Sequence, residues 1–147
     1  MAPGHEHGLA KGSPPPRVLI VDDDASVVET LARLLRLEGY DVLTALDGQA
    51  GLRQIDVAHP DAVLLDLRMP RMDAVAFLRQ LRARDAHRHT AVAVITADYF
   101  VGDTIESELK ALKADLYFKP LWSEDVIQIT RRLIQRRRNN LQPRRGR

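Results

Sequence analysis

Five polar residues that could carry out chemistry stand directly after short apolar runs of this sequence. Asp22 and Asp23 follow the first such run, Asp66 ends the third, Thr96 the fourth, and Lys119 follows the fifth. Carboxylates that lie close together repel one another and raise each other's pKa unless a cation lies among them. A hard divalent cation such as Mg²⁺ prefers oxygen ligands in an octahedron. If the five side chains meet in space, they predict a magnesium site with a hydroxyl and an ammonium group beside it.

Phosphoryl transfer is the reaction that such a group of side chains favours. One carboxylate can attack phosphorus while the metal and a lysine neutralise the phosphoryl oxygens. A nearby hydroxyl can bond a phosphoryl oxygen only once that oxygen is present, which suits a sensor. The plainer interpretation is that the aspartates cap helices, since Asp is a favoured N-cap residue. Capping explains one or two aspartates, but not why Thr96 and Lys119 close the fourth and fifth runs.

These side chains meet only if the apolar runs form one parallel sheet. Strand patterns lie at residues 18–21, 40–45, 62–65, 91–95 and 116–118; helical patterns lie at residues 26–38, 52–59, 75–81, 105–112 and 126–134. Five strands alternating with five helices predict an α/β fold, a doubly wound five-stranded parallel sheet with helices on both faces. In such sheets the functional crevice lies at the carboxyl ends of the strands, near the switch point in strand order.

Four segments, in this order and spacing, resemble the receiver domain of response regulators in two-component signalling. They are VLIVDDD at 18–24, DAVLLDLRMP at 61–70, VITA at 94–97 and YFKP at 117–120. The resemblance covers Arg17 to about Ile134 and implies the flavodoxin-like receiver fold. It implies that Asp66 accepts a phosphoryl group. It also implies that the acid pair Asp22 and Asp23 holds Mg²⁺ together with Asp66 and the backbone carbonyl of Arg68.

The resemblance also implies how the phosphoryl group is sensed. Thr96 would be the switching hydroxyl, Lys119 would pair with the phosphate, and the Lys119–Pro120 peptide bond would be cis. Arg68 and Asp98, two positions beyond the acceptor and the switch threonine, are predicted to flank the path of attacking water and so to set the phosphoryl lifetime. The sequence leaves the direction of that effect open.

Partners follow from the same resemblance. A sensor histidine kinase or a histidine phosphotransfer protein would donate the phosphoryl group, and the domain would support its own phosphorylation and dephosphorylation without being an enzyme. Receivers signal through the face formed by the fourth helix, fifth strand and fifth helix. Tyr99, Phe100 and Trp122 lie near it, and exposed aromatic side chains are favoured interface anchors. If exposed, they would bind a downstream protein or a second copy of the chain; alternatively, Phe100 and Trp122 pack under their loops.

Two positions depart from the family's usual pattern. Ala74 follows Met72 and Asp73 where the family usually has Gly, so the turn must form without that flexibility. The family's aromatic switch residue lies three positions before the lysine, where this chain has Leu116, with Tyr117 one position later. Either the fifth strand is one residue short or the usual tyrosine coupling is absent.

Composition sets the expected boundaries and location. Residues 1–16 are predicted to be a disordered lead-in, residues 17–135 the receiver domain, and residues 136–147 a basic disordered tail. Eight arginines and no acid follow from Arg131 onward, so the tail rather than the body is basic, and we do not expect nucleic acid to be the partner. The tail is too short for a helix-turn-helix unit, which predicts a stand-alone receiver. The absence of cysteine and of a long apolar run predicts a cytoplasmic protein without a membrane span.

Other functions remain open at this stage. The pattern Asp22-x-Asp24-x-Ser26 is similar to the nucleophile motif of haloacid-dehalogenase-type phosphatases, which would make Asp22 the nucleophile and Asp24 the general acid. Such enzymes need a further acidic motif on a later strand, and they leave the segment around Asp66 unexplained. A receiver-fold binding module without phosphorylation, and a nucleic-acid adaptor acting through the arginine-rich tail, are the remaining alternatives.

Overall fold

One sheet of five parallel strands forms the centre of the molecule, in a computed structural model that describes residues 12–141. The strands are β1 (Arg17–Val21), β2 (Asp41–Ala45), β3 (Ala62–Asp66), β4 (Ala91–Thr96) and β5 (Ala114–Phe118). The helices are α1 (Ala25–Leu37), α2 (Gly48–Ala58), α3 (Ala74–Arg82), α4 (Asp103–Ala111) and α5 (Ser123–Leu141), with a 3-10 helix, η2 (Asp85–His87), before β4. The strand order is β2-β1-β3-β4-β5, which confirms the predicted doubly wound fold.

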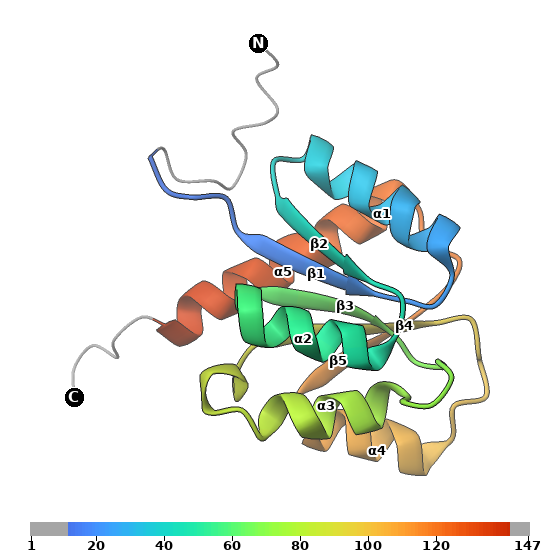
Figure 1. Ribbon diagram of the computed structural model, residues 1–147. Coiled ribbons are helices and arrows are strands. Elements are labelled where there is room, and N and C mark those ends of the chain that lie inside the picture. The colour runs from blue at the N-terminus through green and yellow to red at the C-terminus, as the bar shows by residue number, and fades with distance from the viewer. Residues whose placement is uncertain (1–11, 142–147) are drawn as a thin grey trace.

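Helices cover both faces of this sheet (Figure 1). Alternate strand residues such as Leu19 and Val63 belong to a buried cluster that includes residues of α2, α3 and α4. Their neighbours, such as Ile20 and Leu64, belong to a second cluster with residues of α1 and α5. The central strands are therefore buried on both sides, which is why they read as continuous apolar runs rather than as an alternating pattern.

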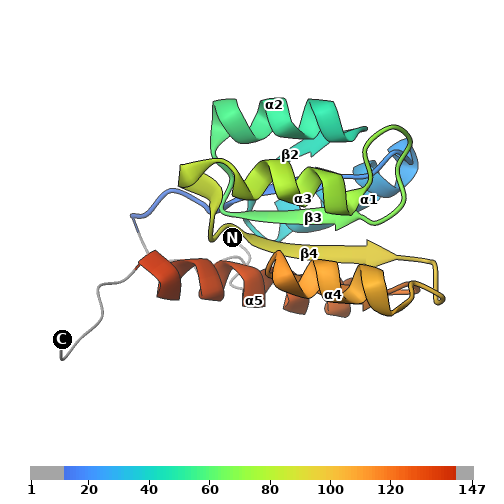
Figure 2. The ribbon, with the colours of Figure 1, turned by 90° about the horizontal axis from the view of Figure 1, so that it is seen from below.

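The strand order reverses between β1 and β3, and this reversal creates the site. The two strands are hydrogen-bonded neighbours, with Val21 paired to Leu65, although β2 lies between them in the sequence. The chain leaves β1 toward one face of the sheet and leaves β3 toward the other, so the connecting loops part and open a crevice. Figure 2 shows β3 and β4 ending on the same side of the molecule. Because β1 and β3 are parallel neighbours, the residues that follow these two strands lie side by side.

The fifth helix is longer than the sequence predicted. It begins at Ser123 and continues to Leu141, past the domain boundary expected at residue 135, so the first part of the expected disordered tail is helical. Leu133 and Ile134 are buried against the sheet, and Arg136 bonds the carboxylate of Asp115 at 2.7 Å, which anchors this end of the helix. Residues 1–11 of the expected lead-in and residues 142–147 of the expected tail lie outside the described residues. No helix within residues 12–141 is both long and apolar enough to cross a membrane.

A buried histidine at the opposite end of the sheet was not foreseen. His87 is only 2% exposed; its imidazole lies 3.0 Å from that of His59, with the rings stacked, and 2.7 Å from the hydroxyl of Thr90. Burial, followed by the nearby His59 and Arg137, lowers the pKa of His87 below its ordinary value of 6.5. The unfolded chain therefore binds a proton more readily at this position than the folded chain does.

We expect this difference to make the fold less stable as the pH falls below about 6.5. The measurement is urea unfolding of the wild type and His87→Gln at pH 7.5 and pH 5.5. The variant should be less stable at pH 7.5, because it loses the packed imidazole, but should lose less stability between the two values. An equal loss in both proteins would show that His87 does not titrate in this range.

Candidate functional site

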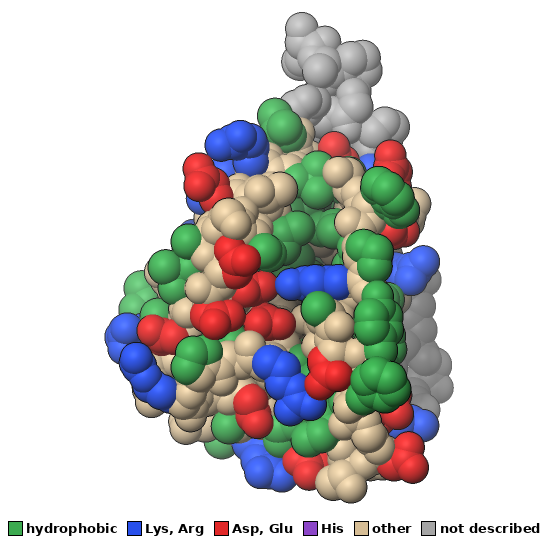
Figure 3. All heavy atoms as spheres, turned by 90° about the vertical axis from the view of Figure 1, so that its right-hand side faces the viewer, with side chains coloured by type: hydrophobic (Ala, Val, Ile, Leu, Met, Phe, Trp, Pro, Cys, Tyr) green, Lys and Arg blue, Asp and Glu red, His purple; other side chains and the backbone are tan. Residues whose placement is uncertain are grey.

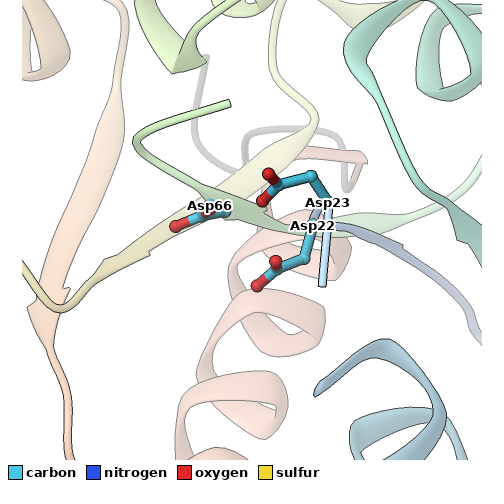
Figure 4. Close-up of side chains that lie close together, drawn as sticks. All are labelled: Asp22, Asp23 and Asp66. Carbon is cyan, nitrogen blue, oxygen red and sulfur yellow. The ribbon is translucent and has the colours of Figure 1, made fainter. Parts of the chain in front are cut away.

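Three carboxylates meet at the carboxyl edge of the sheet. Asp22 and Asp23 follow β1 and Asp66 ends β3; one oxygen of each lies within 4.8 Å of an oxygen of each of the others. Figure 4 shows the three side chains pointing to the same side of this edge. Asp22 is buried, Asp66 is half-buried and Asp23 is exposed, so the cluster opens to solvent on one side. The structure thus brings together the three predicted acids.

The neighbouring Asp24 has a different task. Its carboxylate caps α1, accepting hydrogen bonds from the backbone of Ser26 at 3.0 Å and of Val27 at 3.3 Å, and from the Ser26 hydroxyl at 2.7 Å. The capped turn also points the Asp24 amide at the carboxylate of Asp22, 2.9 Å away, and so helps to orient that carboxylate. Among the aspartates at these strand ends, the capping interpretation is therefore correct for Asp24. The hydrogen bonds from the Ser26 hydroxyl and from the Val27 and Ser26 amides lower the pKa of Asp24, which keeps it ionised rather than ready to act as a general acid.

Burial and charge crowding act together on Asp66. Burial, and after it the carboxylate of Asp22, raises the pKa of Asp66 to about 6, while Lys119 acts in the opposite direction. A smaller contribution from Asp23 also raises it, and the backbone amide of Leu67 lowers it. In the absence of a cation, the cluster therefore holds its charges at a cost in free energy.

The donor set fits a hard divalent cation. All three ligand groups are carboxylates, no nitrogen or sulfur ligand belongs to the cluster, and oxygen ligands are what Mg²⁺ prefers. The acids are also too few to fill an octahedron, which leaves room for water or a phosphoryl oxygen. A cation bound here would also offset the part of the raised pKa of Asp66 that, after burial, comes from the charges of Asp22 and Asp23.

Lys119 and Thr96 complete the edge. The Lys119 ammonium lies 3.6 Å from a carboxylate oxygen of Asp22, and the Lys119–Pro120 bond is cis as predicted. The backbone amide of Lys119 donates to the Thr96 carbonyl at 2.8 Å, so the ends of β4 and β5 are tied together. The Thr96 side chain is buried, and its hydroxyl oxygen accepts the amide proton of Asp98 at 3.0 Å.

The loop after β3 is fixed by apolar anchors. Leu67, Met69 and Met72 are buried in the cluster beneath α2, α3 and α4, which holds the backbone next to Asp66 in place. The departure at Ala74 proves harmless: it is the first residue of α3, and the left-handed conformation in this turn belongs to Arg71, at φ 68°.

Arg68 and Asp98 form an ion pair beside this edge. Two nitrogens of the Arg68 guanidinium donate to the same carboxylate oxygen of Asp98, at 2.8 and 3.2 Å. The pair joins the loop after β3 to the loop after β4. The hydrogen bond from the Phe100 amide, and then Arg68, lower the pKa of Asp98, which keeps it ionised.

The fifth strand resolves the question of the aromatic switch position. It is five residues long and pairs Val94 with Leu116 and Ile95 with Tyr117, so it is not a residue short. Leu116 packs against the cluster on the α4 side of the sheet, whereas Tyr117 packs against the cluster on the α1 and α5 side. The usual tyrosine coupling is therefore absent from β5.

The aromatic residues on the loops after β4 and after β5 are exposed, so they do not pack under their loops. The exposed fractions are 62% for Tyr99, 92% for Phe100 and 76% for Trp122. Phe118 at the end of β5 stacks on Tyr99. Figure 3 looks onto the carboxyl edge, where acidic side chains gather near the centre and hydrophobic side chains form a band along one side. The contact between Tyr99 and Phe118 was missed from the sequence, because nothing local indicates which residues two distant loops bring together.

Comparison with known proteins gives a consistent result. The pattern of the response regulator receiver domain matches residues 18–131. The chain is 39% identical over 122 residues to the transcriptional regulatory protein PrrA of Mycobacterium leprae, covering 83% of this chain and 51% of that protein. It is 38% identical over 122 residues to the response regulator MprA of Mycolicibacterium vanbaalenii, with coverage of 83% and 52%. The chain thus spans about half the length of the curated relatives it matches.

Solved structures agree with this result. The chemotaxis response regulator CheY4 of Vibrio cholerae superposes with a TM-score of 0.75 at 28% identity, covering 81% of this chain and 98% of that one. A response regulator receiver domain protein from Clostridium thermocellum superposes with a TM-score of 0.76 at 26% identity, covering 86% and 99%.

The charge crowding at Asp66 yields a stability prediction. Folding raises the pKa of Asp66 from about 4 to about 6, so ionising this carboxyl costs more free energy in the folded protein than in the unfolded chain. The folded protein therefore loses stability as the pH rises through this range. In metal-free buffer at pH 7.5, Asp66→Asn should therefore be more stable than the wild type by roughly 1 kcal/mol, a value discounted because solvent screens this half-buried group. Thermal unfolding in EDTA measures the difference.

The same variant separates charge repulsion from metal binding. Adding Mg²⁺ should raise the unfolding temperature of the wild type, because a ligand that binds only the folded state stabilises it, and should raise that of Asp66→Asn much less. An Asp66→Asn protein no more stable than the wild type in EDTA, or stabilised equally by Mg²⁺, would contradict this account of the site.

Proposed function

The chain belongs to the response regulator receiver family, and from this premise we propose that Asp66 accepts a phosphoryl group and that the domain passes the signal on as a change of shape. The donor is a sensor histidine kinase or a histidine phosphotransfer protein. The observation that carries the proposal is the convergence of Asp66 with two further carboxylates and the Lys119 ammonium at the switch point of the sheet. Asp66 ends a central strand and is half-buried, which holds it in place while leaving one side open to the donor.

In the proposed transfer, a carboxylate oxygen of Asp66 forms a bond to phosphorus as the bond from phosphorus to the donor's histidine nitrogen breaks. That nitrogen keeps the electron pair and is then protonated from solvent. The attack requires an ionised carboxylate, and the pKa of Asp66, about 6, leaves most of the protein in that form at neutral pH. Lys119 neutralises charge on the phosphoryl oxygens, a role supported by its position beside Asp22.

Asp22, Asp23, Asp66 and the backbone carbonyl of Arg68 are the proposed ligands of Mg²⁺. When bound, Mg²⁺ supplies positive charge to the carboxylates and to the incoming phosphoryl oxygens. The closeness of the three carboxylates supports the first three ligands, and the place of Arg68 on the anchored loop after β3 supports the fourth.

Thr96 is the proposed sensor of the phosphoryl group. Its buried hydroxyl can donate to a phosphoryl oxygen, while its oxygen already accepts the amide proton of Asp98. Movement of this hydroxyl therefore pulls on the loop before α4. The result is a shift in the population of two arrangements of that loop, which a partner distinguishes.

The exposed aromatic residues Tyr99, Phe100 and Trp122 are the proposed contact surface for a downstream protein or for a second copy of the chain. Large exposed aromatic side chains are the residue types that anchor protein interfaces. The proposal retains the cytoplasmic location expected from the sequence. Sedimentation velocity with and without acetyl phosphate and Mg²⁺ separates the two kinds of partner, since only a self-associating chain gains mass on phosphorylation.

Neither rival function gains support at the site. In the phosphatase alternative Asp24 donates a proton to the leaving group, but the hydrogen bonds from Ser26 and Val27 lower the pKa of its carboxyl and hold it ionised. The unphosphorylated binding module gives no reason for three crowded carboxylates and a lysine at one edge. Both alternatives can be tested together with the proposed reaction.

Intact mass spectrometry after incubation with acetyl phosphate tests the proposal. The wild type should gain about 80 Da when Mg²⁺ is present and nothing when EDTA replaces it. Asp66→Asn should gain nothing, because the attacking oxygen is lost. Asp22→Asn should still gain the group, but more slowly, because the attacking oxygen remains while a metal contact and the ion pair with Lys119 are weakened.

Asp85→Asn is the matched control, since Asp85 is a well-exposed aspartate on η2, remote from this edge of the sheet, and it should behave as the wild type. Labelling that persists in Asp66→Asn but disappears in Asp22→Asn would favour the phosphatase chemistry. Absence of labelling in every protein would favour the binding module.

A further inference from the structure

Tyr99, on the loop after β4, makes a hydrogen bond to the backbone of Lys119, the proposed phosphate-binding lysine. The hydroxyl of Tyr99, on the loop between β4 and α4, donates to the main-chain carbonyl of Lys119. The Tyr99 ring stacks on Phe118, with ring centroids 5.8 Å apart and an interplanar angle of 13°. Two adjacent residues at the end of β5 are therefore held by one side chain from a separate loop.

The residue before this tyrosine connects it to the proposed sensor. The backbone amide of Asp98 donates to the Thr96 hydroxyl oxygen, and the carboxylate of Asp98 accepts the amide of Phe100 at 2.9 Å. The carboxylate also accepts the Arg68 guanidinium from the loop after β3. Asp98 thus fixes the backbone on both sides of Tyr99. If the Thr96 hydroxyl moves, the loop either follows it, which displaces Tyr99, or loses the hydrogen bond that holds the backbone next to Tyr99.

The other two tyrosines are placed differently. The chain contains three tyrosines, and Tyr40 and Tyr117 are partly buried against the cluster on the α1 and α5 side of the sheet. The position three before the lysine is occupied by Leu116, which has no hydroxyl and packs on the opposite face. A hydrogen-bonded connection between the loop after β4 and the end of β5 is therefore supplied by Tyr99.

We propose that Tyr99 is a positioning residue that couples Thr96 to Lys119: its hydroxyl holds the end of β5 in the resting arrangement and releases it when Thr96 moves. The inference rests on the proposed phosphorylation of Asp66 and adds to it the route by which the change reaches Trp122, three positions beyond Lys119. A bond that exists only in the resting arrangement opposes the shift. Its removal should therefore favour the phosphorylated arrangement.

Trp122 is the reporter for the test, since it is the single tryptophan of the chain and is exposed. Its emission is followed while beryllofluoride, a phosphoryl mimic, is titrated into the protein with Mg²⁺. Tyr99→Phe keeps the ring that stacks on Phe118 and deletes only the hydroxyl. We expect this variant to half-saturate at a beryllofluoride concentration roughly 2- to 10-fold lower than the wild type, the range of one net hydrogen bond. The emission change on saturation should be smaller, because the resting arrangement is already loosened.

Tyr117→Phe is the matched control, since it makes the same chemical change on the other face of β5, and it should respond as the wild type does. Wild-type behaviour of Tyr99→Phe in both readouts, or an equal effect of Tyr117→Phe, would overturn the inference. Uptake of the phosphoryl group from acetyl phosphate is measured by mass in the same proteins. If the wild type takes up the group while Tyr99→Phe shows no altered response, the coupling alone fails; if the wild type takes up none, the proposed function fails and the coupling with it.

Discussion

Repulsion among three carboxylates confined within 4.8 Å of one another is the constraint on which the rest of this edge depends. The sheet imposes it, because β1 and β3 are bonded neighbours whose ends cannot move apart without breaking their ladder. Burial and, after it, this repulsion raise the pKa of Asp66, and the nearby ammonium of Lys119 offsets only part of the increase. A site strained in this way favours whatever brings positive charge, which is the physical basis for expecting a divalent cation here.

The surrounding residues keep this arrangement rigid on one side and adaptable on the other. Asp24 caps α1 and orients Asp22, and buried apolar side chains hold the loop after β3. The loop after β4 is held instead by polar contacts, through Asp98 and Tyr99, and it carries exposed aromatic residues. Hydrogen bonds near the surface open more readily than buried apolar contacts do, because water can replace the partner that is lost. The loop after β4 is therefore the one that can change its arrangement when the charge at Asp66 changes.

The replacement of the usual switch aromatic illustrates how the same coupling can come from another part of the chain. Leu116 leaves the strand without a hydroxyl on the α4 side, and Tyr117 faces the other way because successive residues of a strand alternate between its faces. The Tyr99 ring then lies over Phe118, which shares a face with Leu116. The aromatic pair therefore connects the loop after β4, which follows Thr96, with the end of β5, which precedes Lys119.

The sequence alone determined the order of strands and helices, the fold class and the residues that gather at the carboxyl edge, because apolar periodicity and strand-end residue types are local properties that a doubly wound sheet converts into position. The choice among interpretations that depend on contacts between distant segments was left to the tertiary structure. It showed that Asp24 caps a helix while Asp22 and Asp23 join Asp66, that Arg71 rather than residue 74 takes the left-handed turn, and that α5 continues to Leu141. The same holds for the bond from Tyr99 to Lys119, which joins residues of two loops. The cap at Asp24 is a local contact, made with Ser26 and Val27. The end of α5 and the hydroxyl of Tyr99 are instead held by residues far away in the sequence, Asp115 and Lys119, and no local pattern records which neighbour that will be.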